Sequence, residues 1–328
     1  MSRQFQSGIR RHIPVASSLA ITASSLARGL LLAASRSSVL RNLASANGLK
    51  FGAARFVAGE TIDEFVPIAR RLNADGFSIA SAILGEEVVE RPQTSGVARE
   101  YVGLLSRIHA EGLNANVALK LTHLGLSIDA DLAAGNLRVI VDSAAGVGNV
   151  VRIDMEDSSC VEQTLQIYRG LRSDGFDNVG AVLQAYLYRT LDDLRSLLPL
   201  RPNLRLVKGA YLEPPSVAFP RKADVDANYR RLIEEALQGD GYTAIATHDE
   251  SAIRHALSFA SAHGIAQSRF EFQMLYGVRP ALQRKLRSEG VPVRIAAPFG
   301  REWYPYFMRR LAERPANVSF LLSSLIRG

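Results

Sequence analysis

The chain has 328 residues, of which 47% are hydrophobic and 22% charged, proportions typical of a globular protein large enough for one extensive core. Its single cysteine, Cys160, excludes an intrachain disulfide framework and a cysteine-clustered metal site, and suits a reducing compartment. No run of about 18 uncharged apolar residues occurs, so we predict no transmembrane helix.

The net charge of +7 is concentrated near the N-terminus. Residues 1–59 contain no Asp or Glu but carry eight positive charges, which leaves the rest of the chain close to neutral, at −1. The positive residues are Arg3, Arg10, Arg11, Arg28, Arg36, Arg41, Lys50 and Arg55. We therefore divide the chain into a basic N-terminal helical arm, residues 1–50, and a folded domain, residues 51–328.

Three interpretations of the arm stay open. It can be a basic amphipathic helix lying on an anionic membrane surface, a helical lid packed on the domain, or a mitochondrial-type presequence. A secretory signal is excluded because Arg28 interrupts the apolar residues 23–34. Nucleic-acid binding is not expected, since the arm lacks interleaved aromatic residues. We expect a cytoplasmic protein, with peripheral membrane contact through the arm as an alternative and a mitochondrial location less favoured.

From residue 77 onward, apolar β-prone runs alternate with helical segments, with Gly, Pro, Asn or Asp at the boundaries. The predicted strands are 77–84, 115–121, 150–155, 180–187, 204–211, 242–247, 270–275 and 291–297. The predicted helices between them are 97–110, 130–144, 159–173, 191–198, 224–237, 251–263 and 280–288. Eight such units without a domain break predict an α/β fold of the (β/α)₈ or TIM-barrel class. A doubly wound sheet is the alternative, but the sequence contains neither GxGxxG nor GxxxxGK[ST].

After the last strand, the chain is expected to turn at residues 298–300 and to form a helix through Leu311. Tyr306, Arg309 and Arg310 share one face of that helix, because positions three and four apart stack on a helix. A pair of guanidinium groups beside an aromatic ring suits planar, bidentate capture of a small carboxylate. A solvated Arg pair on an amphipathic helix is the structural alternative.

In a barrel the functional site forms at the carboxyl ends of the strands, and in this sequence those ends are polar. They carry Lys120, Thr122, His123, Arg152, Asp154, Glu156, Asp157, Gln184, Tyr186, Arg205, Lys208, Gly209, Ala210, Tyr211, Thr247, His248, Asp249, Glu271 and Gln273. No zinc-type histidine or cysteine cluster and no GxSxG motif accompanies them, so no metal site is expected. Several cations with few anions favour a phosphorylated cofactor together with an anionic substrate.

Seven segments in order resemble the proline dehydrogenase family: LKLTHLGL (119–126), RIDMED (152–157), LQAYLYR (183–189), RLVKGAY (205–211), ATHD (246–249), FEFQMLYG (270–277) and WYPYFMRRLAERP (303–315). FVAGET (56–61) and LGEEV (84–88) fit the small, single-function bacterial branch. The resemblance covers roughly residues 50–320. It implies a distorted (β/α)₈ barrel that holds FAD and oxidises proline to a cyclic imine, pyrroline-5-carboxylate, with electrons passed to a membrane quinone.

The resemblance also implies roles for individual residues. Arg309, Arg310 and Lys120 would hold the substrate carboxylate, with Asp154 paired to Lys120. Tyr306 and Leu275 would pack on the substrate ring, and Arg205 would lie near flavin N5. The remaining FAD contacts would come from Gln184 at the isoalloxazine edge, Lys208 at the phosphates, and Asp154, Gly209, Ala210, Tyr211, Thr247, His248 and Gln273.

One departure bears on the substrate. The family usually has Tyr two residues before the proline of the last strand, where this chain has Ala296, followed by Ala297. Relatives that act on hydroxyproline also have a small residue there, so a hydroxylated or otherwise substituted proline is an alternative substrate. His123 stands where the family resemblance leads us to expect Gln. Two other functions stay open: an FAD barrel resembling methylenetetrahydrofolate reductase, and a non-catalytic ligand-binding barrel.

Overall fold

The structure, a computed structural model, describes residues 52–313. Eight parallel strands pair in sequence order, and β1 pairs with β8 to close the barrel. The strands are β1 Ser78–Ile83, β2 Ala115–Lys120, β3 Val151–Asp154, β4 Val179–Gln184, β5 Asn203–Val207, β6 Tyr242–Ala246, β7 Phe270–Leu275 and β8 Val293–Phe299. The predicted (β/α)₈ fold is confirmed.

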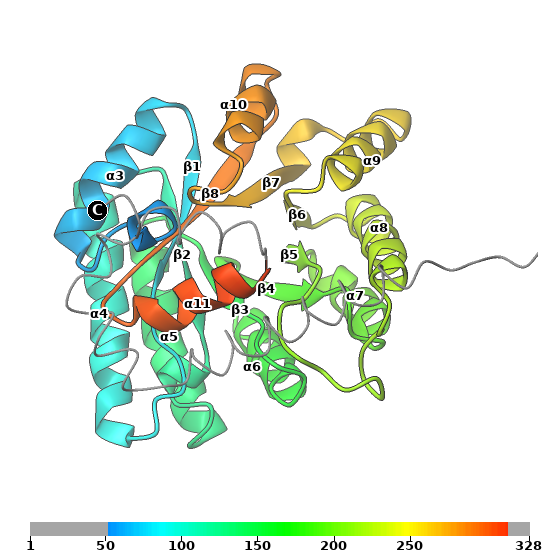
Figure 1. The fold of residues 1–328 in the computed structure, drawn as a ribbon. Helices are drawn as coiled ribbons and strands as arrows, with labels where there is room; N and C mark the ends of the chain where they lie inside the picture. Colours follow the sequence, from blue (N-terminus) through cyan, green and yellow to red (C-terminus); the bar gives the residue numbers. More distant parts are fainter. Residues whose placement is uncertain (1–51, 314–328) are drawn as a thin grey trace, which may run out of the picture. The chain divides into compact units, whose positions relative to one another are not determined.

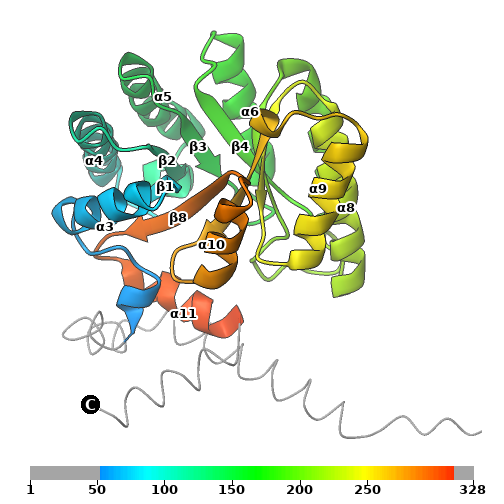
Figure 2. The ribbon, with the colours of Figure 1, turned by 90° about the horizontal axis from the view of Figure 1, so that it is seen from above.

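A helix follows each of the first seven strands and packs on the outside of the barrel wall (Figure 1; Figure 2). Together with the helix that precedes β1, these are α3 Ile62–Ala74, α4 Arg91–Ala110, α5 Ala130–Gly146, α6 Val161–Ser173, α7 Thr190–Leu197, α8 Lys222–Gln238, α9 Glu250–Ala262 and α10 Pro280–Ser288. Short 3₁₀ turns lie at η1 Ala53–Arg55, η2 Thr122–Leu124, η3 Leu198–Leu200 and η4 Gln267–Arg269.

The barrel belongs to a compact unit that spans Ala54–Trp303. The last described helix, α11 Trp303–Glu313, lies outside this unit from Tyr304 onward, so the barrel and α11 are described separately. The expected arm, residues 1–50, lies outside the described residues. Within residues 52–313, none of the helices combines the length and the hydrophobicity needed to span a bilayer.

The faces of β8 decide which of its side chains enter the barrel. Phe299 stacks on Phe65 of α3, with ring centroids 4.8 Å apart, so the Phe299 side of the strand faces the helices. Because successive strand residues face opposite sides, Ala297 shares the helix side, whereas Arg294 and Ala296 face the barrel interior. Ala297 is fully buried and Ala296 is half-buried, as this orientation requires.

Some element boundaries differ from the prediction. The helix α3 was not predicted; it is capped by the preceding Thr61, whose hydroxyl accepts the Glu64 N–H, and it contains Pro67, normally a helix breaker. The last strand does not turn at Pro298. It continues to Phe299, because β1 pairs with it as far as Ile83 and Phe299, and the chain turns at Gly300 with φ +134°.

Candidate active site

The carboxyl ends of β2, β3 and β5 bring an ionic cluster together. Lys120 and Asp154 are register partners on neighbouring strands. Arg205 donates from Nη1 to Asp154 Oδ1 at 2.5 Å, and Lys120 forms an ion pair with Glu86. The expected Lys120–Asp154 pair is therefore wrong for this structure, because each of these two residues has a different partner. Three of the predicted site residues nevertheless lie together at one edge of the barrel.

Arg205 is held rigidly at this edge. Its side chain is only 10% exposed, and its Nε donates to Gln273 Oε1 on β7 at 2.6 Å. Gln273, also a predicted site residue, is 3% exposed. Two hydrogen bonds from different guanidinium nitrogens fix the plane of the group, because the guanidinium fork is rigid.

Gln184, at the end of β4, has one satisfied and one unsatisfied polar atom. Its Nε2 donates to the Glu156 carbonyl at 3.0 Å, while its buried Oε1 has no hydrogen-bond partner among the described residues. The Glu156 carboxylate accepts the Thr122 N–H and hydroxyl at 3.0 and 2.5 Å, which ties the ends of β2 and β3 together. Because a buried acceptor without a donor is costly, the Gln184 oxygen is suited to a ligand N–H.

The segment after β5 comes too close to its neighbour for a side chain at Gly209. This residue has φ +110°, and a Cβ built on it would lie 2.3 Å from the Tyr186 ring. The backbone N–H of Tyr186 donates to the Lys208 carbonyl at 2.9 Å. Ala210 is exposed and Tyr211 half-buried in the same segment. The left-handed φ and the nearby Tyr186 ring together require glycine at position 209.

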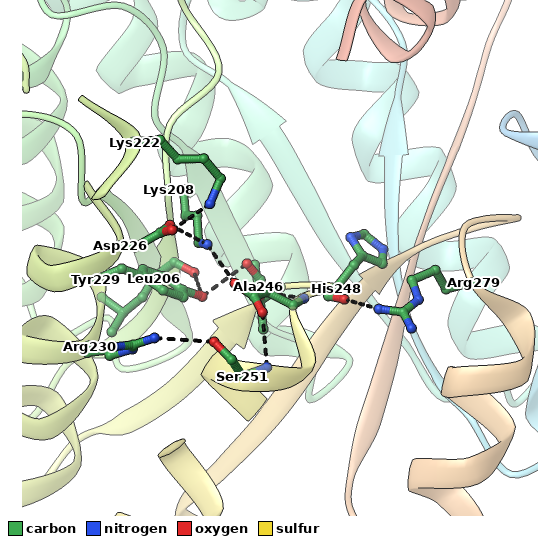
Figure 3. Close-up of polar contacts among 12 residues, drawn as sticks. Leu206, Lys208, Lys222, Asp226, Tyr229, Arg230, Ala246, His248, Ser251 and Arg279 are labelled. Carbon is green, nitrogen blue, oxygen red and sulfur yellow. Dashed lines mark hydrogen bonds and ion pairs between the residues drawn. The ribbon is translucent and has the colours of Figure 1, made fainter. Parts of the chain in front are cut away.

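Lys208 is paired with carboxylates in this structure. Its Nζ lies 2.6 Å from Asp226 and 3.1 Å from Asp249, and Lys222 reaches the same Asp226 at 2.5 Å (Figure 3). Burial alone would raise the pKa of the Asp249 carboxyl, but Lys208 and the Ser251 N–H bring that pKa down to about 2. The predicted phosphate cation therefore already has two anionic partners.

The end of β6 is tied to β7 through backbone contacts. Thr247 donates its N–H to the Gln273 carbonyl at 3.1 Å, and its hydroxyl accepts the Asp249 N–H at 3.0 Å. His248 Nε2 accepts the Leu275 N–H at 2.9 Å, which makes Nδ1 the protonated nitrogen of the neutral ring. The His248 carbonyl accepts from Arg279 at 2.7 Å (Figure 3).

Two predicted substrate-binding positions are adjacent. Leu275 on β7 and Ala296 on β8 are register partners, and Ala80 on β1 is the partner of Ala296 on its other side. The Ala296 carbonyl accepts the Tyr276 N–H at 2.9 Å. Ala296 therefore contributes only a methyl group between Leu275 and Ala80 at the barrel wall.

On α11, the structure brings two of the three predicted residues together. The guanidinium carbon of Arg310 lies 5.3 Å from the centroid of the Tyr306 ring, as expected for residues four apart. Arg309 precedes Arg310 on the same helix. The roles of all three residues toward a substrate stay predictions.

His123, in the turn after β2, is a buried and neutral imidazole. Its side chain packs edge-on against Tyr101 and so closely on Gly85 that a Cβ there would lie 2.3 Å from Nε2. Its Nδ1 has no hydrogen-bond partner in the described part of the chain. Burial, and then the positive charge of Lys120, lower its pKa to about 4.

This pKa predicts a pH-dependent stability. Between pH 4 and the unfolded value of 6.5, the unfolded chain binds one more proton than the folded chain, so stability rises with pH and is lost on acidification. The shift corresponds to about 3 kcal/mol. The free energy of unfolding, measured in urea, should fall between pH 7 and pH 4 in both proteins. In His123→Gln this fall should be smaller than in the wild type by about 3 kcal/mol. An identical pH profile in both proteins would contradict the assignment.

Sequence reasoning gave no role to several charged residues that complete this site. Glu86 follows the end of β1 and could have been found by the same strand-end rule that selected Lys120. Asp226 lies on α8, and no sequence pattern connects it to Lys208. Among the residues that the structure describes, no group of three or more His, Cys, Asp or Glu side chains is arranged to hold a metal ion.

The fold and the cluster define a (β/α)₈-barrel protein with a cluster of paired charged side chains at the strand ends. Residues 66–323 match the family model described as proline dehydrogenase. Proline dehydrogenase 1 of Bacillus subtilis (strain 168) is 43% identical over 300 residues, which cover 92% of this chain and 99% of that protein. Proline dehydrogenase of Deinococcus radiodurans is 45% identical over 280 residues, 84% of this chain and 90% of that protein.

A solved structure shows the same fold. Proline utilization A from Bdellovibrio bacteriovorus superposes with a TM-score of 0.76 at 23% identity, over 88% of this chain. The matched region is 36% of that longer chain. This chain belongs to the proline dehydrogenase family. Membership makes it an oxidoreductase that acts on a CH–NH bond in proline catabolism, and it implies proline as substrate and a flavin as cofactor.

Proposed function

We propose that the chain is an FAD-dependent dehydrogenase that oxidises L-proline, or a hydroxylated proline, to the corresponding cyclic imine. For proline the product is pyrroline-5-carboxylate. The observation that carries the proposal is the cluster of Lys120, Asp154 and Arg205 at the carboxyl ends of β2, β3 and β5, in a chain of this family.

The residues at the strand ends fit a flavin dinucleotide. The unsatisfied Gln184 oxygen would accept a ring N–H, and Gly209 would be among the residues that contact the cofactor. Lys208 would exchange one of its carboxylate partners for a phosphate oxygen. Ala210, Tyr211, Thr247 and His248 would supply the remaining contacts. FAD, when bound, supplies the hydride acceptor.

The substrate would be held by charge at one end and by shape at the other. Lys120, Arg309 and Arg310 would bind its carboxylate, with Glu86 leaving Lys120 when the substrate arrives. Tyr306 and Leu275 would pack on the ring, next to Ala296. Arg205, fixed by Asp154 and Gln273, would present its guanidinium to the flavin.

An absorbance experiment tests this function. The protein purified with FAD should be yellow, and anaerobic addition of L-proline should bleach the flavin band within the time of a turnover. A panel of proline analogues, including 4-hydroxyproline, would rank the substrates. A protein that binds no flavin, or a flavin band that no cyclic imino acid bleaches, would contradict the proposal.

We also propose that a membrane quinone accepts the electrons and that the basic arm brings the enzyme to an anionic surface. Eight positive charges without a carboxylate should give vesicle binding that weakens with salt, because the Debye length is about 8 Å at physiological ionic strength. Deletion of residues 1–45 should abolish most binding to anionic vesicles in a sedimentation assay and leave turnover with a soluble dye nearly intact. Loss of flavin or of folding in the truncated protein would instead identify the arm as a packed lid.

A further inference from the structure

A chain of buried polar contacts crosses the barrel interior from β8 to β3. Arg294 on β8 donates from Nε to Glu271 Oε1 at 2.7 Å, and Gln273 donates from Nε2 to the same oxygen at 2.7 Å. The Gln273 oxygen then accepts from Arg205 Nε at 2.6 Å, and Arg205 reaches Asp154 at 2.5 Å. The contacts thus connect Arg294 to the strand ends through one amide.

The direction of this chain of contacts is set by Glu271. A carboxylate only accepts hydrogen bonds, so it requires the amide nitrogen of Gln273 on its side. The amide oxygen must then face Arg205, which only donates. If position 271 were a neutral amide, Gln273 could rotate by 180° and point its NH₂ at Arg205, which has no acceptor to offer. Glu271 therefore selects the one orientation that holds Arg205.

The groups around Glu271 favour its ionised form. Glu271 is 3% exposed, and burial alone would raise the pKa of its carboxyl, but Arg294 and the Gln273 hydrogen bond hold that pKa below its ordinary value. Arg294 is itself fixed, since its Nη1 donates to the Ile79 carbonyl at 3.0 Å. The carboxylate thus has two donors, Arg294 on β8 and Gln273 on its own strand β7.

We propose that Glu271, held by Arg294 and acting through Gln273, is a positioning residue that aims the Arg205 guanidinium at the flavin. The inference rests on the proposed function, which places the flavin against Arg205. Two of the three guanidinium nitrogens of Arg205 bind Gln273 and Asp154, and no described residue accepts from the third, Nη2. A guanidinium in a fixed plane beside the flavin favours the more negative, reduced form.

The test compares two variants that leave the net charge of the interior unchanged. Glu271→Gln/Arg294→Gln removes the buried ion pair as a unit, so that neither charge is left uncompensated. Gln273→Met keeps the ion pair and removes the amide link, at similar side-chain volume. The matched control is Arg195→Gln/Glu235→Gln, which removes a partly exposed ion pair with a 2.6 Å contact between α7 and α8. Each protein is measured for flavin binding, thermal unfolding, flavin midpoint potential, kcat and KM.

In the double variant Glu271→Gln/Arg294→Gln and in Gln273→Met, we expect KM for proline to change by less than about threefold and kcat to fall at least tenfold. Flavin binding should change by less than about threefold in the double variant, which keeps Gln273. The preference for reduced over oxidised flavin should fall about tenfold, a decrease in midpoint potential of about 30 mV for a two-electron couple. The control should keep the wild-type potential. If the double variant does not fold, Gln273→Met decides the question.

One outcome overturns the inference: wild-type enzyme binds flavin and turns over proline, and the folded Glu271→Gln/Arg294→Gln and Gln273→Met variants have the wild-type flavin midpoint potential and kcat. It is also overturned if kcat falls without a change in potential, since that would indicate general disorder of the site. Failure of the proposed function has a different result: wild-type protein itself would bind no flavin or would not oxidise proline.

Discussion

Replacing Arg309 or Arg310 by Met is expected to raise KM for proline by roughly 30-fold to a few thousand-fold, because truncation of one partner of a buried, hydrogen-bonded charge pair costs about 2–5 kcal/mol. The substrate carboxylate would keep its charge and lose a bidentate donor. Flavin should remain bound, since neither residue is proposed to contact it. Steady-state kinetics with a soluble dye, together with the flavin absorbance of each purified variant, would measure both expectations.

Two controls make this result specific. Arg309→Lys and Arg310→Lys should recover little affinity, because an ammonium cannot reproduce the planar fork of a guanidinium. Arg301→Met, at an exposed arginine in the turn that precedes α11, should behave as wild type. An unchanged KM in both Met variants would eliminate the carboxylate clamp.

The fold could be predicted from sequence because eight repeats of one alternation all indicate the same architecture, so errors at single boundaries do not matter. The expected strand 180–187 ends at Gln184, and the expected strand 204–211 ends at Val207. After β4, apolar residues continue past the last strand residue, because loop residues such as Ala185 and Leu187 are also buried. A run of apolar residues in the sequence therefore indicates that the residues are buried, not that they pair within the sheet.

The location of the candidate site could also be predicted, but its ionic partners could not. Carboxyl-end residues of a parallel barrel must meet at one edge, which is why Lys120, Asp154 and Arg205 lie together. Which carboxylate each cation binds depends on side-chain reach across loops. Lys120 pairs with Glu86 from the β1–α4 loop, and Lys208 with Asp226 from α8, so neither pair follows from spacing. On α11 the four-residue spacing of Tyr306 and Arg310 is enough to predict their contact, and the two side chains are in contact.

The second large effect is expected at Ala296, where the interior face of β8 presents a methyl group beside Leu275. Tyr at this position should pack on unsubstituted proline, a gain of about 1.5–3 kcal/mol for a buried aromatic. The same ring should crowd a ring hydroxyl, at a cost of about 1–3 kcal/mol. Ala296→Tyr should therefore shift the kcat/KM ratio of proline to 4-hydroxyproline toward proline by about two orders of magnitude or more. Wild-type enzyme should use both substrates comparably.

The prediction requires that no other side chain already fills the place of a tyrosine. Phe299 cannot do so, because it lies on the opposite face of β8 and stacks on Phe65 of α3. Tyr276, which follows β7 and donates its N–H to the Ala296 carbonyl, is the remaining candidate. Ala296→Ser, which stays small, should keep the wild-type ratio, and Tyr276→Leu should leave the ratio unchanged as well. A strong wild-type preference for proline that Ala296→Tyr does not move, but Tyr276→Leu does, would assign the wall of the substrate site to Tyr276 instead.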